Sequence, residues 1–271
     1  MAISFARSNG WYALGEKFAI MKKVFVIGIG AGNPDYMTIQ AINALNSVDV
    51  FFVFEKGKDK DDLVRMRKEI CDRFIKDRKY RFFTVRSPAR DATTPSYKAG
   101  VQSWHQERAE ILKSFIKDEM REGECAAFLT WGDPTLYDST LRILQNVRGD
   151  GSLEFDCEII PGISSIQALA ARHKVALNTI GESIQITTGR KLAEELPDSD
   201  SIIVMLDSGE GLKAAENEDV DIYWGAYLGT EYEILVSGKM SEVAGDIQRI
   251  RKQARAERGW IMDTYLLRRN S

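Results

Sequence analysis

Cysteine and histidine are scarce in this sequence of 271 residues. The three cysteines, Cys71, Cys125 and Cys157, lie far apart, and His105 and His173 are the only histidines. No Cys-x-x-Cys pair or comparable Cys/His spacing is present, so neither a structural zinc site nor a disulfide framework is expected. We therefore expect that the protein binds no metal and that its thiols are reduced. Reduced thiols favour a cytoplasmic location.

Excess charge of one sign and long apolar segments are also missing. The 37 Lys and Arg residues nearly balance the 40 Asp and Glu residues, which gives a net charge of −3. The chain therefore has no basic field that would attract nucleic acid or an anionic membrane. No apolar run approaches the roughly 20 residues that span a bilayer. We expect neither nucleic acid nor a membrane as a partner, and an acidic ligand would need a local group of Arg and Lys.

The first 20 residues lack the uninterrupted apolar core of a signal peptide. Met21 stands directly before a strongly apolar segment, so residues 1–20 are separated as an N-terminal extension. Three origins stay open for it: a native extension, a misassigned start or added residues.

What the sequence does contain is a regular alternation of apolar segments. Residues 24–27 form a continuous apolar run that ends at Gly28, which is typical of a buried parallel strand. Residues 37–46 carry apolar side chains at helical spacing, and residues 48–54 form a second apolar run that completes a βαβ unit. Further strands are expected at 80–85, 125–129 and 155–160, and helices at 61–76, 97–121, 139–147 and 164–172.

A second series follows a connector at residues 174–181. It predicts strands at 183–187, 201–206, 221–227, 232–237 and 260–266, and helices at 190–196, 210–216 and 240–254. The whole pattern predicts an α/β protein with two αβα domains, residues 21–174 and residues 175–271.

Three loops combine glycine, proline and small polar residues between an apolar strand and a helix. They cover residues 28–35, 130–139 and 159–165. Ligands of open parallel sheets bind at the carboxyl ends of the strands, and glycine lets a backbone approach a ligand closely. These loops are therefore the expected binding site.

The glycine-rich first loop is similar to the loop of a dinucleotide-binding site. Glu55 ends the next strand, at the position where such a site has an acidic residue that binds the ribose. The G-x-G-x-x-G fingerprint needs glycine at position 33, however, and that position is Asn33, followed by Pro34. An NAD-linked oxidoreductase is therefore a disfavoured alternative, and a solvated carboxylate explains Glu55 equally well.

Helix capping offers a simpler explanation of the other two loops. Asp133 and Pro134 suit an N-cap followed by a first-turn proline, and Ser164 suits another N-cap. Capping does not explain why Trp131 and Tyr137 gather in the same turn. These two aromatic side chains could face a flat ligand, with core packing as the alternative.

The three loops in this order, IGIGAGNPDYMT, GDPTLYDS and PGISS, resemble the signatures of the class III tetrapyrrole methylases. The resemblance covers the chain from Lys22 to the C-terminus. It implies two αβα domains with S-adenosylmethionine bound in a cleft between them, and a homodimer. Relatives often read GxGPG where this chain has GIGAG, which is a departure in the first loop.

The resemblance also implies which residues contact the ligands. The first loop would line the substrate side of the cleft through Gly30, Gly32 and Pro34. The cofactor contacts that carry over by position are Trp131, Gly132, Asp133, Leu136, Ser164, Ser165, Met205, Leu206, Ala226 and Gly238. Relatives often have methionine at the position of Leu206, so that contact departs from the pattern.

Longer stretches, among them YKAGVQSWHQERAEIL and IQALAARHKVALNTIGESIQITTGR, resemble the deacetylating branch of the precorrin methylases. This implies C-methylation of a precorrin in cobalamin biosynthesis, namely methylation of precorrin-5 at C1 with loss of acetate to give precorrin-6A. The alternatives are another precorrin or related class III methylase, and a non-enzymatic tetrapyrrole carrier that kept the fold.

Methyl transfer from a sulfonium to an electron-rich ring carbon requires alignment of the reactants more than a strong protein base. Asp133 is the candidate for positioning or base catalysis. His105 and Asp35 are the candidates to activate water for acetyl cleavage. The simpler interpretation of His105 is an exposed residue on a charged helix.

Carboxylates of the substrate require cationic partners. Arg86 and Arg90 flank a short loop, and Arg190 follows a glycine at a strand end. We expect these three arginines to bind substrate carboxylates, with a solvated surface as the alternative for each.

Overall fold

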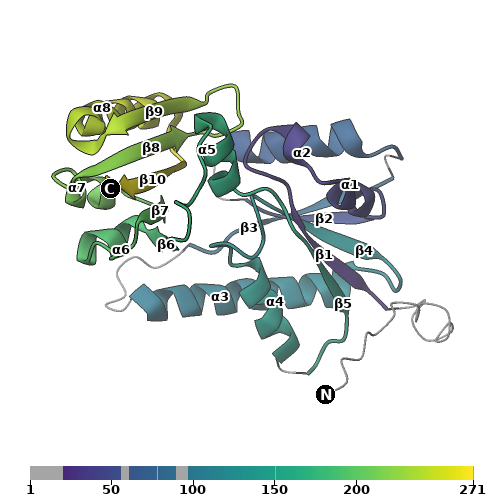
Figure 1. The fold of residues 1–271 in the computed structure, drawn as a ribbon. Coiled ribbons are helices and arrows are strands. Elements are labelled where there is room, and N and C mark those ends of the chain that lie inside the picture. Colours follow the sequence, from purple (N-terminus) through teal and green to yellow (C-terminus); the bar gives the residue numbers. More distant parts are fainter. Residues whose placement is uncertain (1–20, 56–60, 78, 90–96, 150, 271) are drawn as a thin grey trace, which may run out of the picture.

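The computed structural model describes residues 21–55, 61–77, 79–89, 97–149 and 151–270, which fold around two β-sheets (Figure 1). The predicted strands and helices are confirmed, with ends that differ by a few residues. The elements of the first series are β1 (Lys23–Gly28), α1 (Ile39–Leu45), β2 (Val50–Glu55), α2 (Asp61–Phe74), β3 (Arg81–Arg86), α3 (Tyr97–Ser114), β4 (Cys125–Thr130), α4 (Thr140–Gly149) and β5 (Asp156–Ile160).

The first sheet consists of five parallel strands in the order β3-β2-β4-β1-β5. Successive side chains of a strand point to opposite faces of the sheet. Val24 and Val26 of β1 therefore pack with α3 and α4, whereas Phe25 and Ile27 pack with α1 and α2. Because helices cover both faces, β1 must be apolar at every position, as its sequence predicts.

The second sheet has the order β6-β7-β10-β8-β9 and is mixed. Only β6 and β7 run parallel, and the other neighbours are antiparallel. The elements of this series are α5 (Ser165–His173), β6 (Ile184–Thr188), α6 (Gly189–Glu194), β7 (Ser201–Met205), α7 (Glu210–Ala214), β8 (Val220–Ala226), β9 (Ile234–Lys239), α8 (Met240–Arg258) and β10 (Asp263–Arg269). The antiparallel direction of β10 places its first residues beside the last residues of β7 and β8.

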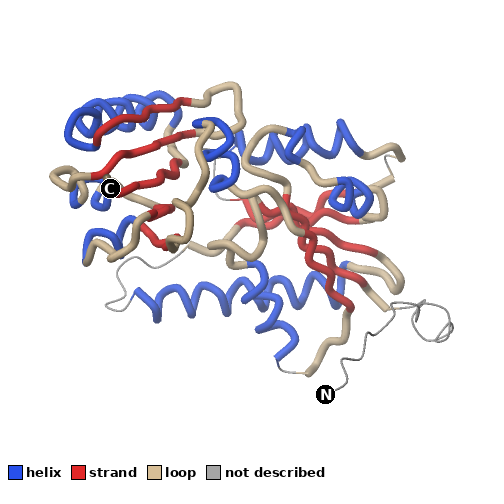
Figure 2. Tube along the Cα trace, in the orientation of Figure 1, coloured by secondary structure: helices blue, strands red, loops and turns tan. Residues whose placement is uncertain are grey.

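Helix α5 follows β5 of the first sheet but packs on the second sheet. Its Ile166 and Leu169 form one apolar cluster with Ile203 of β7 and Leu266 of β10. The opposite face of the second sheet is covered by α6, α7 and α8. Helices consequently flank both groups of strands, and α5 lies between the two sheets (Figure 2).

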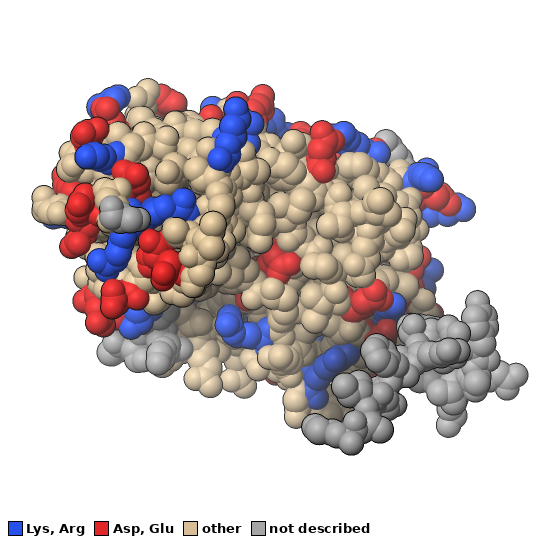
Figure 3. Space-filling view, viewed as in Figure 1, with Lys and Arg blue, Asp and Glu red and all other residues tan. Residues whose placement is uncertain are grey.

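Charged side chains of both signs are mixed along the margins of the molecule, and the middle of the displayed face is largely uncharged (Figure 3). This distribution agrees with the small net charge of −3. Within the described ranges, no helix is both long and apolar enough to cross a membrane.

Candidate functional site

The three glycine-containing loops meet at one point, as their position after β1, β4 and β5 predicts. A Cβ atom on Gly28 would lie 2.6 Å from the amide nitrogen of Gly162, and one on Gly162 would collide with the carbonyl oxygen of Gly132. The backbones of Gly30 and Gly132 also exchange hydrogen bonds, with the shorter at 2.8 Å. Only glycine leaves room for these backbones to touch.

Asp133 fastens the second loop to the third. Its Oδ2 accepts a hydrogen bond from the Gly162 amide at 2.9 Å, and its Oδ1 accepts one from the Thr135 amide at 2.8 Å. Partial burial acts to raise the pKa of Asp133, but the hydrogen bonds from Thr135 and Gly162 outweigh it and hold the pKa below its ordinary value. The ionised carboxylate therefore braces two loops, and both of its oxygens are engaged.

The third loop is tied in turn to the second sheet. Ser164 caps α5 in a capping box with Gln167, which confirms the capping interpretation of this serine. The Ser165 hydroxyl lies 3.0 Å from that of Thr264, on the neighbouring strand β10. Asp133, Gly162 and Ser165 thus form a continuous connection from the first sheet to the second.

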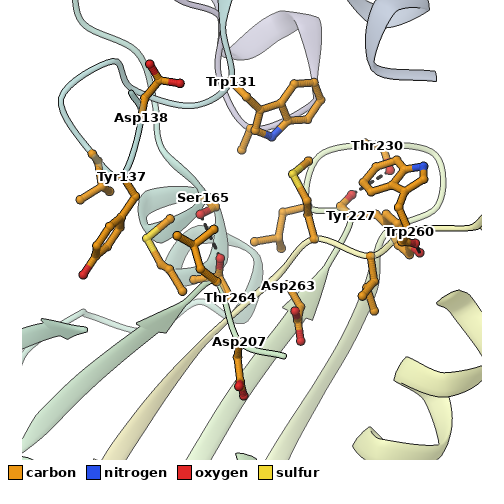
Figure 4. Close-up of a pocket in the computed structure, with 17 residues that line it drawn as sticks. Trp131, Tyr137, Asp138, Ser165, Asp207, Tyr227, Thr230, Trp260, Asp263 and Thr264 are labelled. Carbon is orange, nitrogen blue, oxygen red and sulfur yellow. Dashed lines mark hydrogen bonds between the residues drawn. The ribbon is translucent and has the colours of Figure 1, made fainter. Parts of the chain in front are cut away.

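A cavity of about 240 Å³ opens where this connection joins the two sheets (Figure 4). The loop after β4 supplies one wall with Trp131 and Tyr137, and Asp207, Asp263 and Thr264 of the second sheet lie on the other side of the space. The lining is mainly apolar with a few polar groups, which is the usual character of a small-molecule site. The remaining lining residues are Ala31, Leu136, Asp138, Ser165, Met205, Leu206, Tyr227, Leu228, Thr230, Trp260, Ile261 and Met262.

Backbone strain is concentrated at this cavity. Four described residues other than glycine have a positive φ, and three of them line the cavity: Tyr137 at 53°, Leu206 at 53° and Tyr227 at 51°. The fourth, Lys174, is the C-cap of α5. A left-handed conformation costs roughly 1–2 kcal/mol for such residues. Strain of this kind persists where a site requires it, which supports a ligand-binding role for the cavity.

The floor of the cavity rests on a buried charge network. Asp207 accepts hydrogen bonds from three backbone amides of residues 209–212, each 2.9–3.0 Å long, and from the Tyr265 hydroxyl at 2.9 Å. Asp263 accepts from Trp224 Nε1 at 2.9 Å and from Arg251 Nε at 2.7 Å. Burial raises the pKa of Asp263, and the Arg251 guanidinium opposes that shift. The network holds the ends of β7 and β10 in register.

Five of the ten predicted cofactor residues line the cavity: Trp131, Leu136, Ser165, Met205 and Leu206. Four others support the lining from behind. Gly132, Asp133 and Ser164 form the loop junction, and the buried Ala226 directly precedes Tyr227. The tenth, Gly238, pairs with Ile222 inside the sheet, four positions before Ala226 on β8, so it is separated from the cavity.

The predicted substrate loop lines a second cavity, of about 230 Å³. Gly32 and Pro34 contribute to it, and Tyr227, Thr230 and Trp260 line both this cavity and the first. Gly30 belongs to the same loop and has a φ of 80°. A Cβ atom added to Gly30 would lie 2.8 Å from the Cβ atom of Tyr36. The two cavities are therefore neighbours that share one wall.

The structure places the other catalytic candidates apart from these two cavities. Asp35 is exposed and forms an ion pair with Arg73 of α2. His105 is buried at 9% exposure, so its interpretation as an exposed residue is wrong. The face of α3 that carries His105 points into the protein. The neighbouring Trp104 donates a hydrogen bond to the Pro88 carbonyl at 3.0 Å. Burial lowers the pKa of His105, and the charges of Arg142 and Arg108 lower it further.

The predicted carboxylate-binding arginines also lie outside the two cavities. Arg86 is an exposed residue at the end of β3, and Arg190 is exposed on α6 beside Glu194, at 3.5 Å. Arg90 lies outside the described residues. In the described part of the chain, no group of three or more His, Cys, Asp or Glu side chains could hold a metal ion.

Sequence reasoning missed Asp207, Asp263 and the residues 260–264. Asp207 stands two residues after β7, at the carboxyl end of a strand, so its position was a usable signal. Asp263 begins β10, and only the antiparallel direction of that strand brings its amino end to the cavity.

Known proteins resemble this chain over most of its length. The family model described as Tetrapyrrole (Corrin/Porphyrin) Methylases matches residues 23–244. A relative from Sinorhizobium sp, named precorrin-6A synthase [deacetylating], is 45% identical over 252 residues, which are 93% of this chain and 97% of the relative. A probable cobalt-precorrin-2 C(20)-methyltransferase of Methanocaldococcus jannaschii is 29% identical over 84% of this chain and 92% of its own.

Solved structures share the fold. CobF from Corynebacterium diphtheriae, described as related to cobalamin synthesis, has a TM-score of 0.80 and 38% identity, covering 93% of this chain and all of its own. A uroporphyrin-III C-methyltransferase from Thermus thermophilus, complexed with S-adenosylhomocysteine, has a TM-score of 0.54 and 15% identity, covering 90% of this chain and 96% of its own. This second similarity concerns the fold alone.

Proposed function

Because this chain belongs to the tetrapyrrole methylase family, we propose that it methylates a precorrin with S-adenosylmethionine in cobalamin biosynthesis. The reaction is methylation of precorrin-5 at C1 with loss of acetate, which gives precorrin-6A. The relative with 45% identity carries the name of this activity. The single observation that supports the assignment best is the strained, mainly apolar cavity where all three signature loops meet the second sheet.

The lining residues fit S-adenosylmethionine. Trp131, Leu136 and Met205 offer apolar surface for the adenosyl group, and the hydroxyls of Ser165 and Thr264 offer hydrogen bonds to its polar atoms. Bound there, the cofactor supplies an electrophilic methyl group on sulfur. The Asp207–Arg251–Asp263 network keeps the cavity floor rigid. Both carboxylates accept hydrogen bonds within the protein, and Arg251 also donates to the backbone carbonyl of Asp207.

The protein's contribution to methyl transfer is alignment and exclusion of water. Holding two reactants in a productive orientation can lower a barrier by roughly 7–11 kcal/mol, so no strong base is required for attack by a ring carbon. Asp133 acts as a positioning residue, since both of its oxygens hold loops together. The adjoining cavity beside Gly32 and Pro34 receives part of the tetrapyrrole.

Acetyl cleavage requires activation of a water molecule. His105 is the preferred candidate, because burial lowers the pKa of its imidazole and so favours the neutral form, which can accept a proton. The exposed Asp35 is instead engaged by Arg73. We retain both residues as candidates, with His105 preferred.

The protein forms a homodimer and is cytoplasmic. Ile184 and Ile186 alternate along β6, an edge strand of the second sheet, and are 38% and 43% exposed, while the nearby Ile180 is 97% exposed. Exposed apolar groups on an edge strand, one side of which has no strand partner in the sheet, are typical of an interface. The three cysteines are free thiols, which supports a reducing compartment.

The deciding experiment combines the purified protein with methyl-labelled S-adenosylmethionine and precorrin-5. We expect a labelled tetrapyrrole and one released acetate per transferred methyl group. Methylation without acetate would assign the chain to another methylase branch. A protein that fails to bind S-adenosylhomocysteine in calorimetry would be a carrier, and one that binds NADH instead would be an oxidoreductase.

A further inference from the structure

The loop between β8 and β9, residues 227–233, contains two of the three residues that line both the cofactor cavity and the second cavity. We name it the wall loop. Tyr227, Leu228 and Thr230 line the cofactor cavity, and Tyr227, Gly229 and Thr230 are among the residues that line the second cavity. The wall loop therefore stands where the cofactor and the precorrin would meet.

Hydrogen bonds within the wall loop fix its shape. Tyr227 has a φ of 51°, and its carbonyl oxygen accepts hydrogen bonds from the Thr230 amide at 3.0 Å and from the Thr230 hydroxyl at 2.7 Å (Figure 4). The oxygen of that hydroxyl accepts a further hydrogen bond from the Tyr232 amide at 3.1 Å. Because these bonds are internal to the loop, other contacts must set its position relative to the first sheet.

Two glycines bring the wall loop against the loop that follows β1. A Cβ atom on Gly32 would lie 2.5 Å from the Leu228 carbonyl oxygen, and one on Gly229 would lie 2.7 Å from the Asn33 amide nitrogen. The Cβ atom on Gly229 would also lie 2.9 Å from Cε2 of Tyr36. The two loops thus meet backbone to backbone, so a displacement of the wall loop changes both cavities at once.

Glu233, the last residue of the wall loop, holds the loop from two sides. Its Oε2 accepts a hydrogen bond from the Gly229 amide at 2.8 Å, and its Oε1 accepts one from Arg172 Nε at 2.5 Å. The Glu233 side chain is 12% exposed, and that of Arg172 is 51% exposed. We name this arrangement the Glu233 clamp. It joins the wall loop to α5, whose first residue, Ser165, lines the cofactor cavity.

We propose that Glu233 is a positioning residue for methyl transfer, which fixes the wall loop to α5 and thereby sets the alignment of the cofactor and the precorrin. This inference rests on the proposed function, in which the cofactor occupies one cavity and part of the tetrapyrrole the other. Glu233 is not among the residues that line either cavity, so it acts through the wall loop. A misplacement of about 1 Å can slow a displacement reaction by roughly 100-fold, so a loosened wall loop should slow methyl transfer.

A purely structural ion pair is the alternative role, and the isosteric variant Glu233→Gln separates the two. Glutamine has one acceptor oxygen, and its amide nitrogen only donates, so it cannot accept from both Arg172 and the Gly229 amide. The substitution therefore releases one side of the clamp without a change in side-chain size. Since the Arg172 side chain is half-exposed, loss of its ion pair should change the melting temperature little.

Hydrogen exchange and calorimetry on the full-length protein test the Glu233 clamp without a precorrin. We expect the amides of residues 227–233 to exchange at least threefold faster in Glu233→Gln than in the wild type, and affinity for S-adenosylhomocysteine to fall at least threefold. Arg172→Met removes the exposed partner and should act in the same direction, also if Glu233→Gln does not fold. The matched control Asp246→Asn breaks an exposed ion pair of α8 with Arg249 and should behave as the wild type does.

Steady-state kinetics with precorrin-5 and saturating S-adenosylmethionine then test the positioning role. Glu233→Gln should lower kcat about tenfold or more while its melting temperature stays close to that of the wild type. Wild-type kcat in a variant whose wall loop exchanges faster would overturn the proposal, and so would unchanged exchange at residues 227–233. A wild type that binds S-adenosylhomocysteine but leaves precorrin-5 unmethylated would instead refute the proposed function. In that case, unchanged S-adenosylhomocysteine affinity of Glu233→Gln would overturn the role of Glu233 as well.

Discussion

Replacing Gly162 with alanine tests the loop junction on which the cofactor site depends. The new methyl group would collide with the Gly132 carbonyl oxygen and lie 2.9 Å from the Gly28 Cα, and both obstacles are backbone. Neither can rotate away as a side chain could, so the third loop must move outward. That movement would stretch the 2.9 Å hydrogen bond from the Gly162 amide to Asp133.

The expected loss combines two contributions. Overpacking a close contact costs about 1–3 kcal/mol. A hydrogen bond to a charged group contributes about 1.5–3 kcal/mol, part of which is lost as the loop moves. A total of about 3–5 kcal/mol would lower the melting temperature by on the order of 10 °C, at about 2–4 °C per kcal/mol for a chain of this size. Affinity for S-adenosylhomocysteine should fall as well, because Ser165 moves with the loop.

The assay is thermal unfolding by calorimetry, together with titration of S-adenosylhomocysteine. Gly245→Ala is the matched control, since Gly245 is a helical glycine of α8 with no atom within 4 Å of an added Cβ. Alanine there should be neutral or stabilising by up to about 1 kcal/mol. If Gly162→Ala kept both the melting temperature and the affinity of the wild type, the tight three-loop junction would be refuted.

Three further predictions concern single residues. Asp133→Asn should destabilise the protein by about 1–3 kcal/mol at pH 7. The pKa of Asp133 in the folded state lies below its ordinary value of 3.8, so the difference in stability between the two proteins should persist above pH 3.8 and shrink as the pH falls below it. Urea unfolding at several pH values measures this difference. A difference that does not depend on pH would reject the role of the charge. Arg190→Ala should leave both KM for the precorrin and S-adenosylhomocysteine affinity unchanged, because Arg190 is exposed beside Glu194 and lies outside both cavities; a raised KM with unchanged S-adenosylhomocysteine affinity would instead make it a substrate contact. Ile186→Glu should convert a dimer to a monomer in light scattering, and an unchanged mass would place the interface elsewhere.

The first sheet could be predicted closely because its strands are buried on both faces. A continuous apolar run such as residues 24–27 fits a strand that helices cover on both faces, so the sequence and the structure agree there. The loops after β1, β4 and β5 were found for the same reason, since parallel strands end at one edge of a sheet.

The second sheet could be predicted only in part from the sequence. Strand positions follow from apolar runs, but the direction of β10 depends on tertiary pairing with β7 and β8. Met205 and Leu206 were named through the family resemblance, whereas Asp263 and Thr264, which reach the cavity at the amino end of a strand, were missed.

The position of α5 limits how the chain can be divided. Although α5 precedes the connector at residues 174–181, its Ile166 and Leu169 cover Ile203 and Leu266 of the later sheet. A C-terminal fragment cut within the connector would expose that apolar face to water and would be prone to aggregate. A cut before Ser164 would instead leave the N-terminal fragment with five of the seventeen residues that line the cofactor cavity. The packing of α5 therefore couples the first group of strands to the second, across the boundary that the connector suggests.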